Sequence, residues 1–241
     1  MALIAALGLF TVGLPQYRSQ AAVPSPTAGL IAFVRDGGPP ESGIYTIAPT
    51  GSNLSRLTEG GDYRPRWSPD GTKIVFQRFD ADSVKSYIYV MDADRTNVVQ
   101  LTTRTGFQPA WSPDGTKIVF GSGVGRKEEI FVMNADGSSP TRLTTNRVED
   151  VLPAWSPNGE TIAFTSKRHR NWDIYLMTPD GANKQRLTSS AAFDSNPDWS
   201  PDGTRSVFLA SPPSASVGFL SGLVGRHNPT LAALLWPTLR P

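Results

Sequence analysis

The sequence predicts an all-β fold, a β-propeller of four-stranded blades with about four blades, incomplete or truncated at one end. A motif of five residues, Trp-Ser-Pro-Asp/Asn-Gly, occurs four times at intervals of 44 residues. Such a period indicates a repeat with one structural unit per period. Each period holds four short β-rich runs and no helical periodicity, which is typical of one propeller blade. A β-sandwich is the alternative, but sandwiches do not repeat a motif at a fixed period.

The repeated motif is predicted to be a tight turn anchored by a tryptophan. Serine, proline and glycine are favoured at the first, second and fourth positions of a type I turn, and Asp or Asn is tolerated at the third. The tryptophan before it is a large apolar anchor that fixes the turn to a core. We therefore expect the aspartates of the motif to be turn residues rather than catalytic acids, and the tryptophans to be buried structural residues. The tryptophans are Trp67, Trp111, Trp155 and Trp199, and the aspartates are Asp70, Asp114 and Asp202.

Each unit is expected to begin with an extended segment that ends in Pro-x-Trp, because the residue before a proline avoids the helical region. After the turn come two β-rich runs, a polar turn and a short closing strand that contains Leu-Thr. The paired runs are expected at residues 30–34 and 44–47, 73–77 and 87–91, 117–120 and 130–133, and 161–165 and 174–177. The closing strands are expected near residues 56–58, 100–102, 142–144 and 186–188.

The chain divides into four regions. Residues 1–22 resemble a secretory signal peptide, with an apolar run and a small-residue cleavage pattern, although no basic residue precedes the run. A misplaced start codon and a fragment of a longer gene are the alternatives for this segment. Residues 23–29 are a proline-containing linker, residues 30–210 hold the repeats, and residues 211–241 form an irregular or divergent tail without the motif.

The first and last units are expected to be incomplete. The first has no Pro-x-Trp segment, and the last begins at residue 197 and shows no later strands. In closed propellers the end of the chain often supplies the strand that the first blade lacks. Residues 196–199 could in this way complete the sheet that contains residues 30–34. The run at residues 205–209 does not fit this closure, since the first unit already has the equivalent strand.

Composition and motifs exclude several classes of function. A formal net charge of +2 is too weak to predict a nucleic-acid partner, and the absence of cysteine excludes disulfides and thiolate metal sites. Neither a nucleophile elbow nor a phosphate loop nor a zinc-protease motif occurs. The acidic turns at residues 92–94 and 134–137 lack the later ligands of a calcium loop. The sequence thus predicts a protein without enzymatic activity, cofactor, metal site or integral membrane span.

The units resemble a known family of repeats. The pattern Pro-x-Trp-Ser-Pro-Asp-Gly, followed by Ile-x-Phe, Ile-Tyr-x-Met, Asp-Gly and Arg-Leu-Thr, is similar to the TolB-like β-propeller repeat, a Pro-Asp relative of the WD repeat, over about residues 30–209. Residues 153–188 match it most fully. Such repeats occur in the periplasmic TolB protein of the Tol-Pal system and in the propeller domains of prolyl oligopeptidase-like enzymes. The resemblance implies a propeller fold. The N-terminal segment predicts a periplasmic or secreted location, or a cytoplasmic one if that segment is not a signal.

Blade geometry indicates where binding residues should lie. The first strand of each blade lines a central channel, and the repeated turns share one face. The loops between the second and third strands share the opposite face and differ in length and charge, at residues 77–86, 121–129 and 165–171. Repeat proteins place unit-specific binding residues on such a variable face. We therefore expect a non-catalytic scaffold that binds a protein or peptide partner there. The alternatives are a propeller module that binds a small ligand or carbohydrate in its channel, and one that regulates an enzyme on another chain.

One loop on the variable face is the leading binding candidate. Residues 167–172 belong to the most regular unit but have no counterpart in the other units. Arginine and tryptophan are enriched at binding hot spots and attract each other through cation–π contact. We expect Arg168, Arg170 and Trp172 to contact an acidic or aromatic partner, unless Trp172 packs beneath its own loop.

A second set of candidates lies before the first strand of each unit. Asp62, Gly106, Asp150 and Asp194 each stand five residues before a repeat tryptophan. If the sheets ring an axis, the three carboxylates meet at the channel mouth and could hold a hard cation such as calcium. The favoured alternative is that each aspartate caps its own turn, with no metal bound.

Overall fold

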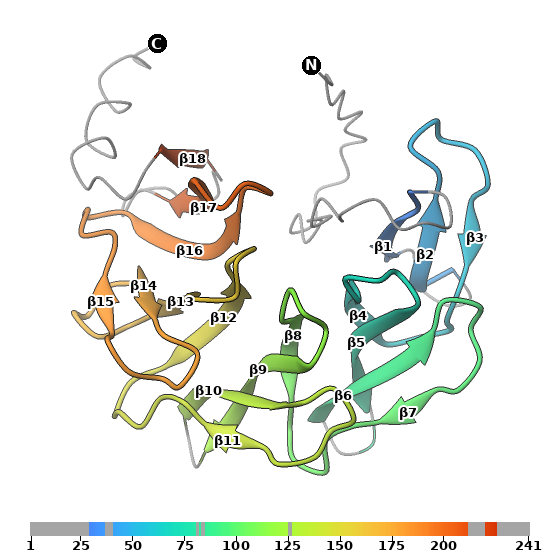
Figure 1. The fold of residues 1–241 in the computed structure, drawn as a ribbon, viewed down its shortest axis with the longest axis horizontal. Coiled ribbons are helices and arrows are strands. Elements are labelled where there is room, and N and C mark those ends of the chain that lie inside the picture. The colour runs from blue at the N-terminus through green and yellow to red at the C-terminus, as the bar shows by residue number, and fades with distance from the viewer. Residues whose placement is uncertain are drawn as a thin grey trace.

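The computed structural model describes residues 29–36, 41–80, 82, 85–124, 127–211 and 220–225. Every regular element in this part of the chain is a β-strand, and the strands form five antiparallel sheets. Figure 1 shows that the sheets follow one another around an arc in chain order. The all-β propeller expected from the sequence is confirmed. It is an incomplete propeller, because the first and fifth sheets make no contact with each other through their described strands.

The three sheets in the middle of the arc each contain four strands in chain order. The second sheet consists of β4 (Asp62–Trp67), β5 (Lys73–Asp80), β6 (Lys85–Asp92) and β7 (Val99–Gln100). The third consists of β8 (Phe107–Trp111), β9 (Lys117–Val124), β10 (Lys127–Asn134) and β11 (Thr141–Arg142). The fourth consists of β12 (Asp150–Trp155), β13 (Ile162–Ser166), β14 (Asp173–Met177) and β15 (Gln185–Arg186). The paired runs and closing strands thus lie close to where the sequence places them.

The sheets at the two ends of the arc have three strands each. The first contains β1 (Ile31–Arg35), β2 (Gly43–Ile47) and β3 (Ser55–Arg56), and it lacks the Pro-x-Trp strand as expected. The fifth contains β16 (Phe193–Trp199), β17 (Arg205–Ser211) and β18 (Leu220–Gly225). Among the described residues, no helix is long and apolar enough to cross a membrane.

Two expectations about the end of the chain are wrong. Residues 196–199 do not complete the first sheet but pair with β17, where Trp199 lies opposite Ser206. The turn at residues 200–203 joins the two strands directly, and a local pairing costs less loop-closure entropy than one across the whole chain. The fifth sheet also gains a later strand, because β18 pairs with β17 along its length. This strand lies in the segment expected to be irregular, and its sequence carries no repeat motif.

The repeated motif forms the predicted turn. In the first copy, the Gly71 amide donates to the Ser68 carbonyl at 2.9 Å. The Ser68 hydroxyl donates to an Asp70 carboxylate oxygen at 2.6 Å and accepts from the Lys73 amide at 2.9 Å. Gly71 has a φ of 69°, a conformation that favours glycine. Asp70 is therefore held as a turn residue, and the same bonds recur at Asp114 and Asp202.

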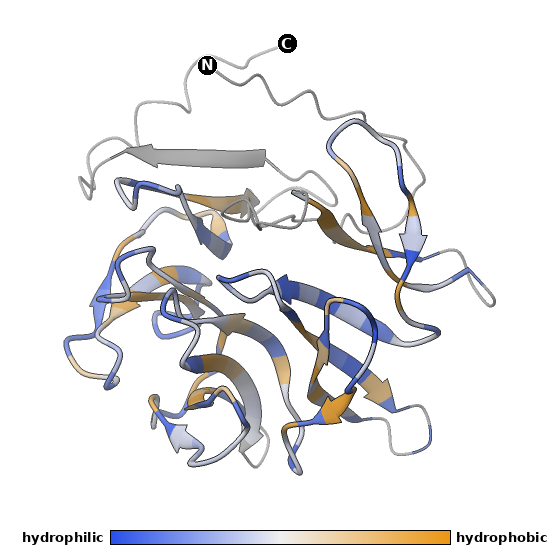
Figure 2. Ribbon diagram, turned by 45° about the vertical axis from the view of Figure 1, so that its right-hand side comes forward, coloured by the Kyte–Doolittle hydropathy of each residue, from blue (hydrophilic) through white to orange (hydrophobic). Residues whose placement is uncertain are grey.

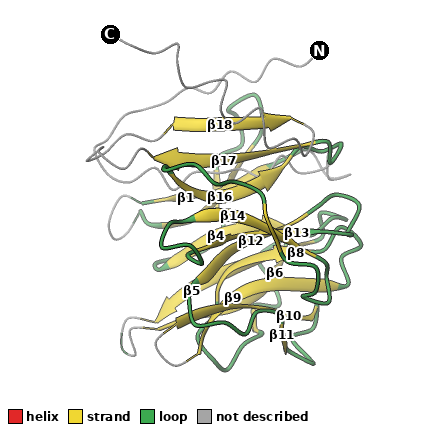
Figure 3. Cartoon of the chain, turned by 90° about the vertical axis from the view of Figure 1, so that its left-hand side faces the viewer, coloured by secondary structure: helices red, strands yellow, loops and turns green. Residues whose placement is uncertain are grey.

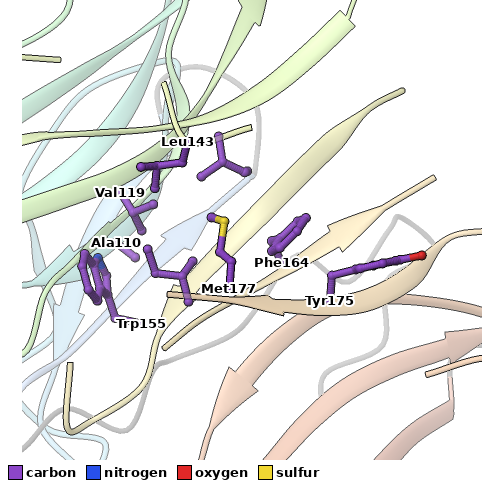
Figure 4. Packing of buried hydrophobic residues seen from close by; sticks show 9 residues of the cluster. Ala110, Val119, Leu143, Trp155, Phe164, Tyr175 and Met177 are labelled. Carbon is purple, nitrogen blue, oxygen red and sulfur yellow. The ribbon is translucent and has the colours of Figure 1, made fainter. Parts of the chain in front are cut away.

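The repeat tryptophans join neighbouring sheets. The Trp111 indole nitrogen donates to the Arg66 carbonyl of the preceding sheet at 3.2 Å. Trp155 packs among Ala110 and Val119 of the third sheet, as Figure 4 shows. Both tryptophans are buried, at 8% and 7% exposure. Trp67 and Trp199 are only partly buried, which differs from the expectation that all four are buried. The sheet before Trp67 has no Pro-x-Trp strand to cover it, and Trp199 lies in the last sheet of the arc.

The threonine of the closing Leu-Thr motif also has a repeated role. In each of the first four sheets, this hydroxyl accepts a hydrogen bond from the backbone amide of a buried isoleucine. The isoleucine lies on the strand that pairs with the closing strand. The pairs are Thr58 with Ile44, Thr102 with Ile88, Thr144 with Ile130, and Thr188 with Ile174. Figure 2 shows hydrophobic and hydrophilic residues mixed along the strands and mainly hydrophilic residues at the turns, and Figure 3 shows the loops on either side of the stacked strands. The strands thus form a rigid frame that presents loops on two faces.

Candidate functional site

The innermost strands carry a repeated backbone irregularity. The residue before the proline has positive φ in each of them: 54° at Arg64, 57° at Gln108, 56° at Leu152 and 60° at Asn196. The segments are strands, as expected, but the residue before each proline departs from the extended conformation. A β-bulge lies at each position, so that the segment from Tyr63 to Arg66 faces the shorter segment from Gln77 to Val75. Proline suits such a bulge because it has no amide to leave unpaired.

The four bulges surround a cavity on the inner side of the arc. Its volume is only about 20 Å³, and Figure 1 shows β4, β8, β12 and β16 nearest the middle of the arc. The residues that precede the four prolines line the cavity, and they are Arg64, Gln108, Leu152 and Asn196. The residues that follow the prolines also line it, and they are Arg66, Ala110, Ala154 and Asp198. All four sheets that have a Pro-x-Trp strand therefore contribute to it.

Hydrogen bonds between sheets hold three of these bulges. The Leu152 amide donates to the Gln108 side-chain oxygen at 2.7 Å, and the Gln108 amide donates to the Gln77 side-chain oxygen at 3.2 Å. The Asn196 amide donates to the Thr165 hydroxyl at 3.0 Å. Each bond pairs an amide that the bulge removes from the strand ladder. The lining is therefore fixed by contacts that cross from one sheet to the next.

The charges around the cavity are uneven. Arg64 and Arg66 both lie on β4, whereas Asp198 lies on β16 at the other end of the row. Burial, and to a lesser extent the neighbouring charge of Arg66, lower the pKa of Arg64 to about 10. The guanidinium stays protonated at neutral pH. The β4 end of the cavity is thus a region of concentrated positive charge.

The three candidate aspartates are held within their own sheets. Asp62 is buried and accepts two hydrogen bonds from Arg78, at 2.7 and 2.8 Å. Asp150 is buried and pairs with Arg168 at 2.9 Å. Asp194 accepts from the Ser190 hydroxyl at 3.3 Å, and burial raises its pKa. Within the described ranges, no group of three or more acidic, histidine or cysteine side chains is placed to hold a metal ion.

Gly106 shows why the series of aspartates is interrupted. A Cβ at this position would lie 2.8 Å from the Ile88 side chain and 3.1 Å from the Thr102 hydroxyl. The space that an aspartate would occupy is filled by the neighbouring strand and by the threonine that caps it. At Gly106 the backbone therefore lies too close to β6 to carry a side chain without a shift.

The loop at residues 167–172 has an internal part and an exposed part. The Arg168 guanidinium pairs with buried Asp150 and lies over the Tyr175 ring, 5.1 Å from its centroid. Arg170 is exposed and has a φ of 62°. Trp172 is partly buried, and the Lys167 amine lies 5.3 Å from its ring. The structure thus separates the three candidates, since Arg168 belongs to the frame and Arg170 and Trp172 border the surface.

Sequence reasoning missed the cavity residues, although the sequence contains a signal for them. The proline and the tryptophan of each Pro-x-Trp segment recur at a fixed period. The residues on either side of the proline differ from unit to unit, as Arg64 and Arg66 do from Gln108 and Ala110. Variation at two positions inside an otherwise repeated strand indicates side chains that the frame does not constrain.

Comparisons with known proteins agree with this architecture. The model of the TolB beta propeller domain matches residues 31–218. A protein assigned as TolB from Agrobacterium tumefaciens has a similar structure, with a TM-score of 0.70 and 24% identity over 76% of this chain and 70% of that one. TolB from Acinetobacter baumannii gives a TM-score of 0.67 and 21% identity over 81% of this chain and 52% of its own.

A peptidase also shares the fold. A puromycin-hydrolyzing peptidase from Mycobacterium tuberculosis gives a TM-score of 0.61 and 16% identity, over 86% of this chain and 35% of that one. At these identities the likeness shows the fold alone. A comparison with curated proteins finds no match. The family model covers most of the chain, and the chain therefore belongs to the TolB β-propeller domain family.

Proposed function

We propose that this chain is a non-catalytic scaffold of the cell envelope, and that it binds a protein or peptide partner through the loop at residues 167–172. A scaffold without catalysis is supported by the absence of a nucleophile elbow, a phosphate loop and a zinc-protease motif from the sequence. The envelope location rests on the apolar N-terminal run and on the family resemblance.

The arrangement of Arg170 and Trp172 is the observation that carries the proposal. Arg170 is exposed, and Trp172 is partly buried beneath the Lys167 amine. The Trp172 carbonyl accepts from the Asp194 amide at 2.8 Å, which ties the loop to the fifth sheet. A fixed aromatic ring with cations around it fits an acidic or aromatic partner at low entropic cost.

Arg168 supports the loop rather than the partner contact. Its guanidinium neutralises buried Asp150 and covers the Phe164 and Tyr175 rings. The ring of His169 stacks on Tyr175, and its Nδ1 lies 2.6 Å from the Tyr175 hydroxyl. These contacts hold the base of the loop in one conformation, so that its tip presents a preformed surface.

The test uses variants of the loop tip in capture from envelope extracts. The double change Arg170→Ala with Trp172→Ala should abolish capture of a stoichiometric partner and leave the melting temperature near that of the unchanged chain. Arg104→Ala, at an exposed arginine outside the loop, is the matched control and should capture normally. A double variant that still captures the partner, or that melts several degrees earlier, would show that the tip is structural.

A variant of the loop base separates the two roles of the arginines. Arg168→Ala leaves the buried Asp150 carboxylate without its ion-pair partner, and such a loss typically costs roughly 3 kcal/mol. We expect this variant to be less stable in urea denaturation. Equal stability of Arg168→Ala and Arg170→Ala would contradict the division of the loop into base and tip.

A further inference from the structure

We propose that β1, the inner edge strand of the first sheet, binds an extended segment of another protein with the pattern Asp-x-x-Pro-x-Trp. Such a segment would add to the sheet as an antiparallel inner strand. The site lies at one end of the arc, whereas the proposed partner surface lies on the loop at residues 167–172. The inference therefore goes beyond the proposed function and does not depend on it.

The inner edge of β1 is the first observation. In each of the other four sheets, a strand with a Pro-x-Trp segment pairs with the inner edge of the next strand along the chain. The first sheet has no such strand, and among the described residues no strand pairs with the other edge of β1. Figure 1 shows β1 as the strand of its sheet nearest the middle of the arc. An edge strand presents backbone groups that can pair with another chain.

Ile31 shows where an apolar side chain of the ligand would lie. It begins β1 and is 37% exposed, although it holds the position of a core residue. The equivalent residue of the second sheet is Ile74, which is fully buried and lies opposite Trp67 of the inner strand. In the fourth sheet, Trp155 lies opposite the buried Ile162 in the same way. A tryptophan opposite Ile31 would therefore cover an apolar side chain that the first sheet leaves partly in water.

Arg35 supplies the charge that selects an acidic residue. Its guanidinium lies over the Tyr45 ring, 5.8 Å from the centroid, as that of Arg78 lies 4.7 Å from the centroid of the Tyr89 ring in the second sheet. Arg78 lies opposite Asp62 of the inner strand and donates two hydrogen bonds to it, at 2.7 and 2.8 Å. Arg35 thus occupies the position of an arginine that pairs with an inner-strand aspartate.

The ion pair that Arg35 makes within its own sheet is a weak one. Its Nη2 lies 4.0 Å from a Glu41 carboxylate oxygen, and the two side chains are 49% and 61% exposed. Exposed pairs of this kind contribute little to stability, so a ligand can replace this one at low cost. An aspartate in the position of Asp62 would accept paired hydrogen bonds from the Arg35 guanidinium.

The two contacts fix the spacing of the ligand sequence. In β4 and in β12, an aspartate that pairs with an arginine stands five residues before the tryptophan, and the proline lies between them. A segment with this spacing would place its aspartate opposite Arg35 and its tryptophan opposite Ile31. The proline suits the bulge between them, because it has no amide to leave unpaired.

A different protein is the source of the segment that the observations favour. The 241-residue sequence contains four Pro-x-Trp segments, which end at the four repeat tryptophans. Each of them pairs with the next strand of its own sheet. The corresponding strands of a second copy would be engaged in the same way. We therefore assign the edge of β1 to a segment of a different protein.

The experiment is an NMR titration of the purified full chain with acetyl-Asp-Val-Leu-Pro-Ala-Trp-amide, which has the sequence of β12. We expect saturable shifts of the β1 amides and nuclear Overhauser contacts between the peptide indole and the Ile31 methyl groups. The reversed peptide, acetyl-Trp-Ala-Pro-Leu-Val-Asp-amide, has the same composition and charge and should not bind saturably. Absence of saturable shifts in β1, or equal binding of the reversed peptide, would overturn the proposal.

Two other occupants of the edge give distinct results. If a second copy fills it, the free chain sediments as a dimer that Ile31→Asp dissociates. If residues 1–28 or 226–241 of the same chain fill it, the peptide shifts the β1 amides only after that segment is removed. Either result would assign the edge to an occupant other than a different protein and would contradict the proposal.

Variants of Arg35 test the register of the added strand. Arg35→Gln should weaken peptide binding by about tenfold, because the paired hydrogen bonds to the aspartate are lost. Arg35→Asp should bind a peptide with lysine in place of aspartate more tightly than the original peptide, a reversal that a loss of structure would not produce. The double change Arg170→Ala with Trp172→Ala should leave peptide binding unchanged, which separates this site from the proposed partner surface. Unchanged affinity of Arg35→Gln, no reversal with the lysine peptide, or loss of binding in the double variant would contradict the assignment.

Discussion

At the scale of single residues, the same repeat position serves different purposes in different sheets. Asp62 and Asp150 are both buried at the start of an inner strand and both pair with an arginine. Asp194 occupies the equivalent position in the fifth sheet, but there the Ser190 hydroxyl donates to the carboxylate at a longer distance of 3.3 Å. Burial raises the pKa of Asp194. Equivalent carboxylates therefore affect the stability of the folded chain in different ways.

This difference predicts the pH dependence of one variant. Since the folded-state pKa of Asp194 lies above the unfolded value, its ionisation destabilises the fold at pH values above the raised pKa. The effect disappears as the pH falls below the ordinary value of about 4. Asp194→Asn should therefore raise the melting temperature at pH 7 and have little effect near pH 3, as measured by calorimetry.

Asp62→Asn is the matched control for that measurement. It removes a carboxylate that accepts two bonds from Arg78, so it should lower the melting temperature at pH 7. If Asp194→Asn also lowers the melting temperature at pH 7, the carboxylate stabilises the folded chain and our interpretation of its environment is wrong.

The repeat tryptophans give a second prediction at this scale. Trp155 is buried between the third and fourth sheets, so Trp155→Ala should cost roughly 3–5 kcal/mol of unfolding free energy in urea denaturation. Trp67→Ala should cost less, because Trp67 is partly exposed at the first sheet. A cost below about 1 kcal/mol for Trp155→Ala would contradict its role in joining the sheets.

At the scale of elements, the polar turn before the closing strand packs against the preceding sheet wherever there is one. Gly51 and Gly181 occupy equivalent turns, with φ values of 83° and 81°. A Cβ at Gly51 would meet nothing within 4 Å, whereas one at Gly181 would lie 2.6 Å from the Leu143 carbonyl oxygen of the third sheet. The first sheet has no sheet before it, so the same turn is open there and closely packed in the middle of the arc.

The two glycines therefore predict different costs for the same substitution. Gly51→Ala should cost about 1 kcal/mol from backbone strain alone. Gly181→Ala should cost roughly a further 1–3 kcal/mol, because the backbone of the third sheet must move. The measurement is unfolding in urea for both variants. Equal costs would show that the turns do not pack against the preceding sheet as described.

Local signals explain how much of the elements could be predicted from the sequence. The turn chemistry around Pro69 and Gly71 and the β-rich runs depend on neighbouring residues, so β5 and β10 lie where the sequence places them. The bulges at Arg64 and its equivalents depend on bonds between sheets, such as that from Leu152 to Gln108. No sequence motif predicts the pairing of β18 with β17. The cavity could not be predicted because it arises only where four distant strands meet.

At the scale of the whole molecule, stability depends on contacts between neighbouring sheets. The hydrophobic clusters run from one sheet to the next, as the cluster around Trp155 and Val119 does (Figure 4). In such repeats each unit is stabilised mainly by its neighbours. The frame can therefore tolerate variation in its loops and in its inner lining. The loop at residues 167–172 is the region to which we assign partner binding.

Hydrogen exchange of the chain with and without its captured partner tests the proposed function most directly. Amides at residues 167–172 should exchange more slowly in the complex, while the turns at residues 68–71, 112–115, 156–159 and 200–203 on the opposite face should be unchanged. Slower exchange at those turns, with none at residues 167–172, would show that the partner binds the other face and would contradict the assignment of Arg170 and Trp172.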